Sequence, residues 1–529
     1  MSGDKAGEGV LEPISKRAFL QASLTTMLAG ASPAQALGTP RKRVAPAAKT
    51  PLVTGPFDST EASLKAYQTP AWFRDAKFGI WAHWGPQAVP RQGDWYARFM
   101  YVPGHPHYQH HLQTYGHPSE VGYKDLIPLW RAERFDPEAL MAKYAAAGAK
   151  YFVSMGVHHD NFDLWNSRHQ RWNSVAMGPK RDIVGAWKAA ATRRGLRFGV
   201  SEHLGASYTW WHPNQLYDQF WPKLGVRYDG ADPRFADLYY DNRDEPFVNT
   251  PESWYTKNPV HQKRWFDRIS DLLDQHQPDL LYSDGGLPFG ETGRALLAHF
   301  FNRNIARGGG LQAVYNCKDS GSGAFDPAWA VQDVERGVLK GINPLPWQTD
   351  TSNGDWFDNA TYEYKSCTEV VTMLADIVSK NGNMLLNVVL HADGSLPPES
   401  ETLLAELAPW MKVNAEAIHG TRPWKIFGEG PTEAAAGMFK EKAVYTARDI
   451  RFTTKDDTLY AIALGEPRGQ TVVTALGASN PHEKRRVRDV RLLGHPGVLR
   501  FRQTDQALLI DVPDRLPTRH ASAFAIRFI

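Results

Sequence analysis

The fold is decided by a helix-to-strand pattern, DPEALMAKYAAAGAKYFVSMGVHH, which runs from Asp136 to His159. Asp136 has the side chain of a helix N-cap, the proline after it suits the first helical position, and Gly148 ends the helix. The stretch 150–155 then predicts a buried strand. His158 and His159 follow this strand directly, so we expect their side chains at its carboxyl end.

The same helix–strand unit recurs three times further along the chain. Predicted helices precede predicted strands, with 183–194 before 196–200, 262–275 before 279–284, and 369–380 before 384–389. This alternation indicates a parallel sheet, and polar residues at several strand ends favour an α/β fold with a closed (β/α)8-like barrel over an open doubly wound sheet. No G-x-G-x-x-G motif follows these strands, which weakens the case for a dinucleotide-binding fold.

After about residue 430 the pattern changes to short strands separated by turns. These strands are predicted over 444–452, 458–464, 471–476, 487–493, 498–503, 507–512 and 523–529. Their spacing is typical of a β-sandwich. We therefore expect a (β/α)8-like domain over 67–430 and a C-terminal β-sandwich domain over 431–529.

Composition and charge limit the class of protein. The 529 residues are 42% hydrophobic and 12% aromatic, enough to bury a large core in more than one domain. The 60 Lys and Arg residues nearly balance the 57 Asp and Glu residues, so we expect no nucleic-acid partner, whereas a neutral substrate fits. Two cysteines, Cys317 and Cys367, exclude a disulfide framework, and their spacing leaves open whether they pair.

The N-terminus has the pattern of an export signal. SKRAFL at 15–20 closes a polar region, a mildly apolar stretch follows, and AQA at 34–36 offers a small-x-small cleavage site, which predicts a signal peptide over 1–36. The Lys-Arg pair resembles a twin-arginine signal, and an ordinary secretory signal is the alternative. Pro, Ala, Lys and Thr dominate 37–66, which predicts a linker. We expect a periplasmic or secreted protein without a membrane anchor, because no later stretch reaches about 18 uninterrupted apolar residues.

One carboxylate holds a position typical of catalysis. Asp284 lies in LLYSDGGLPFG, where a predicted strand gives way to a loop. Barrel enzymes place their catalytic acids at this end of the strands. The alternative is an aspartate that only caps the next loop.

Several motifs occur together in one order. They are AKFGIWAHWG, GDWYARFMY, YKDLIPLWRAERFDPEALMAKYAAAGAKYFV, HHDNFDLW, RDIVGAWKAAATRRGLRFGV, PDLLYSDGG, PWQTDTSNGDW, VSKNGNMLLN and AEAIHGTRPW. With these motifs the chain resembles the α-L-fucosidases of glycoside hydrolase family 29 from about Ala71 to Phe427. The resemblance implies an irregular barrel followed by a β-sandwich, and a retaining, exo-acting enzyme that releases L-fucose from a fucosylated oligosaccharide or glycoconjugate.

The resemblance also implies catalytic roles. Asp284 occupies the family's nucleophile position, and a retaining glycosidase needs a second carboxyl group about 5–5.5 Å away as the acid and base. Our choice is Glu335 in VQDVERGVLKG, at about the spacing expected before PWQTDTSNGDW. Asp333, Glu291 and Glu202 are the alternatives.

Sugar-binding residues follow from the same motifs. By motif position, the residues that would read the sugar hydroxyls are His83, Asp94, Trp95, His158 and His159. Trp356 or Phe357 would face the methyl group of fucose. Asp94 stands where the family often has Glu, and Ser201-Glu202-His203 stands where many relatives carry a Tyr, so this segment departs from the family pattern.

Three alternatives stay open at this point. Paired histidines at a strand end are also typical metal ligands, although the resemblance implies a reaction without metal or organic cofactor. The same fold could act on a different sugar, such as a galactoside. A decayed barrel could bind carbohydrate without hydrolysing it, and a surviving Asp284 with a nearby acid argues against that.

Overall fold

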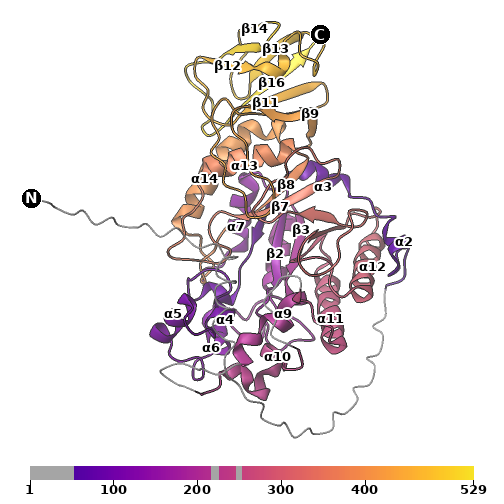
Figure 1. Cartoon of the computed structure of the whole chain (residues 1–529), viewed down its shortest axis with the longest axis vertical. Helices are drawn as coiled ribbons and strands as arrows, with labels where there is room; N and C mark the ends of the chain where they lie inside the picture. The colour runs from indigo at the N-terminus through magenta and orange to yellow at the C-terminus, as the bar shows by residue number, and fades with distance from the viewer. Residues whose placement is uncertain (1–52, 216–224, 246–252) are drawn as a thin grey trace, which may run out of the picture. The chain divides into compact units, whose positions relative to one another are not determined.

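The computed structural model describes residues 53–215, 225–245 and 253–529. Eight parallel strands follow one another in chain order and close into a barrel, because β8 pairs with β1 (Figure 1). The barrel strands are β1 (Phe78–Ala82), β2 (Tyr151–Val157), β3 (Arg197–Glu202), β4 (Leu280–Ser283), β5 (Val314–Lys318), β6 (Val331–Asp333), β7 (Trp347–Ser352) and β8 (Gly382–Asn387). The predicted (β/α)8-like fold is confirmed.

Helices surround the barrel and connect its strands. The long ones are α7 (Pro137–Ala146), α8 (Ile183–Arg193), α11 (Pro259–His276), α12 (Glu291–Ala306), α13 (Cys367–Ser379) and α14 (Pro398–Asn414). The short ones are α2 (Glu61–Leu64), α3 (Ala71–Ala76), α4 (Tyr96–Phe99), α5 (Pro106–Thr114), α6 (Tyr123–Leu126), α9 (Leu204–Trp210) and α10 (Ala236–Tyr239). Between β5 and β7, all of which is described, loops replace the helices, so the barrel is irregular there.

Aspartate side chains cap two of the predicted helices. Asp136 accepts hydrogen bonds from the backbone N–H groups of Glu138 and Ala139 at the start of α7. Asp182 accepts one from Gly185 at the start of α8. These bonds satisfy backbone donors that have no partner inside the helix, so they fix where each helix begins.

Two antiparallel sheets form the C-terminal β-sandwich. The five-stranded sheet has the order β13-β16-β11-β10-β9, and the three-stranded sheet has the order β12-β15-β14. Their strands are β9 (Arg422–Glu429), β10 (Ile450–Lys455), β11 (Thr458–Ala463), β12 (Gln470–Val473), β13 (Val487–Leu492), β14 (Phe501–Gln503), β15 (Leu508–Asp511) and β16 (Ser522–Phe528). Side chains from both sheets share one apolar core. The β-sandwich prediction is confirmed, although β9 was not among the predicted strands.

A buried ionic contact joins the barrel to the sandwich. Asp376 on α13 accepts hydrogen bonds from Arg451 on β10 and, at 2.7 Å, from Lys380. All three side chains are almost fully buried, and the loss of one partner would leave a charge without compensation. The two domains are therefore fixed to each other by packed elements.

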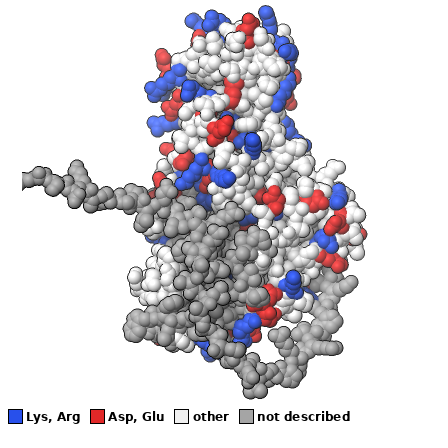
Figure 2. Space-filling model, in the orientation of Figure 1, with Lys and Arg blue, Asp and Glu red and all other residues white. Residues whose placement is uncertain are grey.

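The remaining sequence predictions concern the termini, the cysteines and the surface. The predicted signal peptide and residues 37–52 of the predicted linker lie outside the described residues. Among the described residues, no helix is both long enough and apolar enough to span a membrane. Cys317 and Cys367 are both buried and free. Figure 2 shows basic and acidic side chains interspersed over the described part of one face.

Candidate active site

Asp284 lies one residue beyond β4, at the carboxyl end of the barrel. Its Oδ1 accepts a hydrogen bond from Lys318 Nζ at the end of β5. Its Oδ2 lies 3.1 Å from His159 Nε2 and 3.3 Å from His203 Nδ1. Burial alone would raise the pKa of Asp284, but the charge of Lys318 and the contacts with both histidines hold it well below its usual range. Asp284 is therefore a carboxylate at neutral pH.

Lys318 links Asp284 to a second carboxyl group. Its Nζ donates to Glu335 Oε2 at 2.7 Å, and Glu335 lies two residues beyond β6. The other oxygen, Glu335 Oε1, accepts from Trp356 Nε1 at 3.2 Å. Burial would lower the pKa of Lys318, but the nearby carboxyl groups, led by Asp284 and Glu335, raise it well above its usual value. One permanent cation thus holds both candidate catalytic carboxyl groups.

Three histidine rings pack together beside Asp284. The ring of His158 lies 5.0 Å from that of His83 and 4.7 Å from that of His203, measured between centroids. Burial lowers the pKa of His83 and His158 well below the usual value, and lowers that of His203 to about 4. Neutral imidazoles have one donor and one acceptor each, which suits recognition of sugar hydroxyls.

His159 is held from two sides. Its Nδ1 lies 2.8 Å from the His203 carbonyl oxygen, and Ser207 Oγ donates to the His159 carbonyl at 2.6 Å. These contacts fix the ring so that Nε2 points at Asp284. The orientation of the ring is therefore set by α9 and by the end of β3.

Asp94 and Trp95 extend the site from the loop after β1. Asp94 Oδ1 lies 3.7 Å from His158 Nε2 and accepts from the Trp95 backbone N–H at 2.9 Å. The opposite ring nitrogen, His158 Nδ1, lies 2.7 Å from Gln87 Nε2. Trp95 has a left-handed backbone, with φ of 64°, and its ring lies 5.9 Å from that of His159. An unusual backbone at a site residue indicates a functional constraint.

Trp356 and Phe357 form an aromatic wall. Their rings lie 5.4 Å and 4.6 Å from that of His83. Trp356 also packs on Trp81 of β1 at 5.5 Å. The structure thus brings all eight predicted site residues into one cluster around Asp284, while the role of each stays a prediction.

The alternative acids occupy other environments. Asp333 is buried within β6, where it accepts from Gln348 Nε2 at 2.9 Å, and burial with Asp350 nearby raises its pKa well above the usual value. Glu202 is buried and accepts from Ser283 Oγ at 2.6 Å. Glu291 is exposed at the start of α12. Glu335, our choice, instead shares the cation of Lys318 with Asp284.

Sequence reasoning missed or doubted three residues of the site. Lys318 was missed because the strand that ends with it was not predicted. His203 lies beside Asp284, although its segment departs from the family pattern. Tyr255 Oη donates a hydrogen bond to the Asp284 carbonyl at 3.1 Å and was not among the predicted site residues. A lysine that ends a short apolar run, VYNCK, is the signal that could have revealed Lys318.

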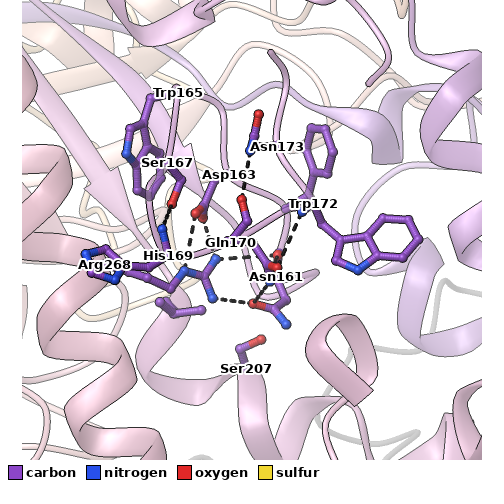
Figure 3. Close-up of polar contacts among 12 residues, drawn as sticks. Asn161, Asp163, Trp165, Ser167, His169, Gln170, Trp172, Asn173, Ser207 and Arg268 are labelled. Atoms are coloured by element: carbon purple, nitrogen blue, oxygen red, sulfur yellow. Dashed lines mark hydrogen bonds and ion pairs between the residues drawn. The ribbon is translucent and has the colours of Figure 1, made fainter. Parts of the chain in front are cut away.

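A closed polar network fixes the loop that carries His158 and His159 (Figure 3). Arg268 on α11 forms an ion pair with Asp163 and donates to Asn161 Oδ1, and both members of the ion pair are fully buried. Asn161 has a left-handed backbone, with φ of 66°. The network holds the loop directly after the two histidines, so α11 supports the segment that follows them.

Two overlapping groups in the site have donor atoms close enough to hold a metal ion. They are His83, His158 and His203, and His159, His203 and Asp284, with atoms within 4.8 Å of one another. The ammonium group of Lys318 already neutralises Asp284, so a further cation would be repelled there. Gln87 occupies one ring nitrogen of His158. These contacts favour an organic, hydroxyl-bearing ligand over a metal ion.

Comparison with known proteins identifies the family. A family model described as alpha-L-fucosidase matches residues 45–416. The chain belongs to the α-L-fucosidase family. Human plasma α-L-fucosidase is 29% identical over 497 residues, which cover 89% of this chain and 92% of that protein. Human tissue α-L-fucosidase is 27% identical over 485 residues, which cover 88% and 89%.

Solved structures of this family agree with the fold. Thermotoga maritima α-fucosidase in complex with fucose has a TM-score of 0.67 and 26% identity, with 89% of this chain and 100% of that chain covered. A second α-L-fucosidase has a TM-score of 0.68 at 25% identity, with the same coverage. The chain is thus a glycoside hydrolase of the α-L-fucosidase family, with a catalytic barrel and a β-sandwich.

Proposed function

We propose that this enzyme is a retaining, exo-acting α-L-fucosidase that releases L-fucose from fucosylated oligosaccharides or glycoconjugates by double displacement. The observation that carries the proposal is the sharing of Lys318 Nζ by Asp284 and Glu335. Two hydrogen bonds to one nitrogen keep their nearest oxygens within roughly 6 Å. So short a separation is compatible with the roughly 5–5.5 Å between the carboxyl groups of retaining glycosidases, which is less than the roughly 6.5–9.5 Å of inverting ones.

In the first step, one oxygen of Asp284 attacks the anomeric carbon of the fucoside. The bond from that carbon to the leaving oxygen breaks, and the leaving oxygen takes the proton of Glu335. The ionised state of Asp284 supports its role as nucleophile, because only a carboxylate has the electron pair that the attack needs. The products are a fucosyl ester on Asp284, a free alcohol and an ionised Glu335.

In the second step, water attacks the same anomeric carbon. Glu335 accepts a proton from the water, the ester bond to Asp284 breaks, and Asp284 leaves as a carboxylate. Lys318 balances the charge in both steps, because it contacts each carboxyl group as the negative charge moves from one to the other. Two inversions at one carbon leave the configuration of the sugar unchanged.

The surroundings of Asp284 support a pocket for one sugar. Its side chain is 16% exposed, with neutral histidines on one side and the Trp356–Phe357 wall on another. Histidine nitrogens and Asp94 would bind hydroxyl groups, and the aromatic wall would contact the methyl group of fucose. The fucose complex of the Thermotoga maritima relative supports this choice of sugar.

Two variants test the assignment. We expect Asp284→Ala to reduce kcat at least roughly 10⁴-fold on every fucoside. Glu335→Ala should lose roughly 10²–10⁴-fold on substrates with poor leaving groups and far less on activated aryl fucosides, because a good leaving group needs no proton. Azide should restore turnover of an aryl fucoside by Glu335→Ala, with fucosyl azide as product. Undiminished hydrolysis of a natural fucoside by Glu335→Ala would exclude this acid, and a nitrophenyl galactoside panel controls for sugar preference.

We also propose that the enzyme is exported. The support is the pattern over 1–36, with its Lys-Arg pair and the AQA site. Expression of the full chain followed by fractionation and N-terminal sequencing tests this. Periplasmic or secreted protein that begins at Leu37 is expected, and an intact N-terminus in the cytoplasm would contradict the proposal.

A further inference from the structure

A segment between the two domains crosses the loop that carries Glu335. This crossing segment, residues 431–449, connects β9 to β10 and forms neither a helix nor a ladder strand. The backbone N–H of Gly437 donates to the Val338 carbonyl, and that of Phe439 donates to the Glu335 carbonyl, both at 2.9 Å. The crossing segment is thus hydrogen-bonded to the backbone of the residue that we assign as the acid.

Glu441 anchors the crossing segment. It accepts hydrogen bonds from Arg336 Nη1 at 3.1 Å, from Lys365 Nζ at 2.8 Å and from Thr351 Oγ1 at 2.6 Å. Burial would raise the pKa of Glu441, but Lys365 and Arg336 hold it below its usual value, so it stays ionised. A largely buried carboxylate with three donors fixes the backbone on either side of it.

Gly337 allows the two backbones to meet. A Cβ atom at this position would lie 2.2 Å from the carbonyl oxygen of Gly437 and 3.1 Å from the Cα of Met438. Any larger side chain would push the crossing segment away from the Glu335 loop. The close contact is therefore a specific feature of this sequence.

Phe439 in the crossing segment combines an exposed aromatic ring with a left-handed backbone. Its side chain is 59% exposed, and its backbone is left-handed with φ of 57°. A single exposed aromatic residue is ordinary, but the left-handed backbone and the direct bond to Glu335 are not. Tyr362, which is 41% exposed, lies in the loop between β7 and α13, with its ring 5.9 Å from Arg336 Cζ. Two residues with exposed aromatic rings, Phe439 and Tyr362, thus contact the loop that carries Glu335.

We propose that Phe439 forms a binding subsite for the leaving group, a neutral pyranose whose C–H face stacks on the ring. The inference rests on the proposed function. In the first step the departing oxygen takes its proton from Glu335, so the group attached to that oxygen lies on the Glu335 side of the pocket. Phe439 is fixed to that residue's backbone. An aromatic ring binds the apolar face of a neutral sugar without needing a charge.

The test compares two leaving groups. We would measure kcat/KM for Phe439→Ala on a fucosyl disaccharide, whose leaving sugar reaches the ring, and on α-L-fucosyl fluoride, whose leaving group is one atom. Loss of the ring should lower the disaccharide value about 5-fold to 10-fold and leave the fluoride value within about 2-fold. Phe439→Tyr should retain both values. Val444→Ala, a truncation at an 89% exposed residue of the same segment, is the matched control.

Each outcome is decisive. An equal loss on both substrates, or no loss on the disaccharide, would overturn the subsite. A wild-type enzyme that cleaves neither fucoside would instead refute the proposed function. Unchanged circular dichroism and melting temperature in Phe439→Ala would show that the ring is not needed for folding.

Discussion

The cluster of Asp284, Lys318 and Glu335 and the cluster of Asp163, Arg268 and Asn161 both surround one cation with oxygen acceptors, but they differ in burial. Asp163 and Arg268 are fully buried, whereas the side chains of Asp284 and Glu335 are 16% and 14% exposed. The guanidinium of Arg268 also donates hydrogen bonds in a fixed geometry, from two nitrogens to Asp163 and from the third to Asn161 Oδ1. The first cluster is open to a ligand and the second is closed.

The two clusters differ in the cation that they contain, and this difference suits one to catalysis and the other to holding a loop in place. A planar guanidinium holds one geometry, while an ammonium group can turn its three protons between partners. Lys318 can therefore follow the negative charge as it moves between Asp284 and Glu335. Arg268 instead locks the loop whose histidines contact the sugar in our proposal.

Of the variants that compare the two clusters, the one that breaks the closed cluster has the largest expected effect. Arg268→Met would leave Asp163 as an unpaired buried carboxylate, which lowers the free energy of unfolding by about 3–5 kcal/mol. Arg171→Met is the matched control, because Arg171 pairs with Asp237 at an exposed site and should contribute less than about 1 kcal/mol. Urea unfolding followed by tryptophan fluorescence measures both. Similar losses of unfolding free energy in the two variants would show that the buried ion pair stabilises the protein no more than the exposed one.

The next effect comes from the cation of the open cluster. Lys318→Met should lower kcat/KM about 100-fold, because the charge that stabilises both carboxylates is lost. Lys318 lowers the pKa of Asp284, so its removal lets burial raise that pKa. Asp284 then becomes protonated at a higher pH, and the acidic limb of the pH profile moves upward. Lys318→Arg keeps the charge and should leave the limb near its wild-type position. If the acidic limb of Lys318→Met stays at its wild-type position, Lys318 does not hold down the pKa of Asp284.

The smallest effect concerns one hydrogen bond. Trp356→Phe keeps an apolar ring but removes the N–H that donates to Glu335 Oε1. The loss of about 1 kcal/mol predicts a drop in kcat/KM of about 5-fold on a fucosyl disaccharide. Trp172→Phe removes a comparable bond, from Trp172 Nε1 to Asp237 at 3.1 Å, and should leave activity unchanged. Equal activity in both variants would show that Trp356 does not position the acid.

The fold could be predicted where local signals were strong. Asp136 and Asp182 cap the helices that the sequence predicted, because capping depends on a few adjacent residues. β6 has only three residues and no connecting helix, so it gives no periodic signal. β9 lies at the change of domain and is only partly buried along its length, which obscures its pattern.

The sequence could predict only those site residues that lie within recognisable motifs. Asp284 and the histidine pair stand at strand ends, which sequence periodicity locates. Glu441 contacts Arg336 across 105 residues, and no local pattern encodes such a contact. Lys318 was missed for a related reason, since its importance comes from two carboxylates that follow β4 and β6, the strands on either side of β5.

Covalent trapping tests whether Asp284 is the nucleophile. The enzyme would be incubated with a 2-fluoro-fucosyl fluoride, digested, and analysed by tandem mass spectrometry. We expect a single 2-fluorofucosyl ester on the peptide that contains LYSDGG, with the adduct on Asp284. An adduct on another residue, or a released sugar of inverted configuration in a parallel NMR assay, would contradict it.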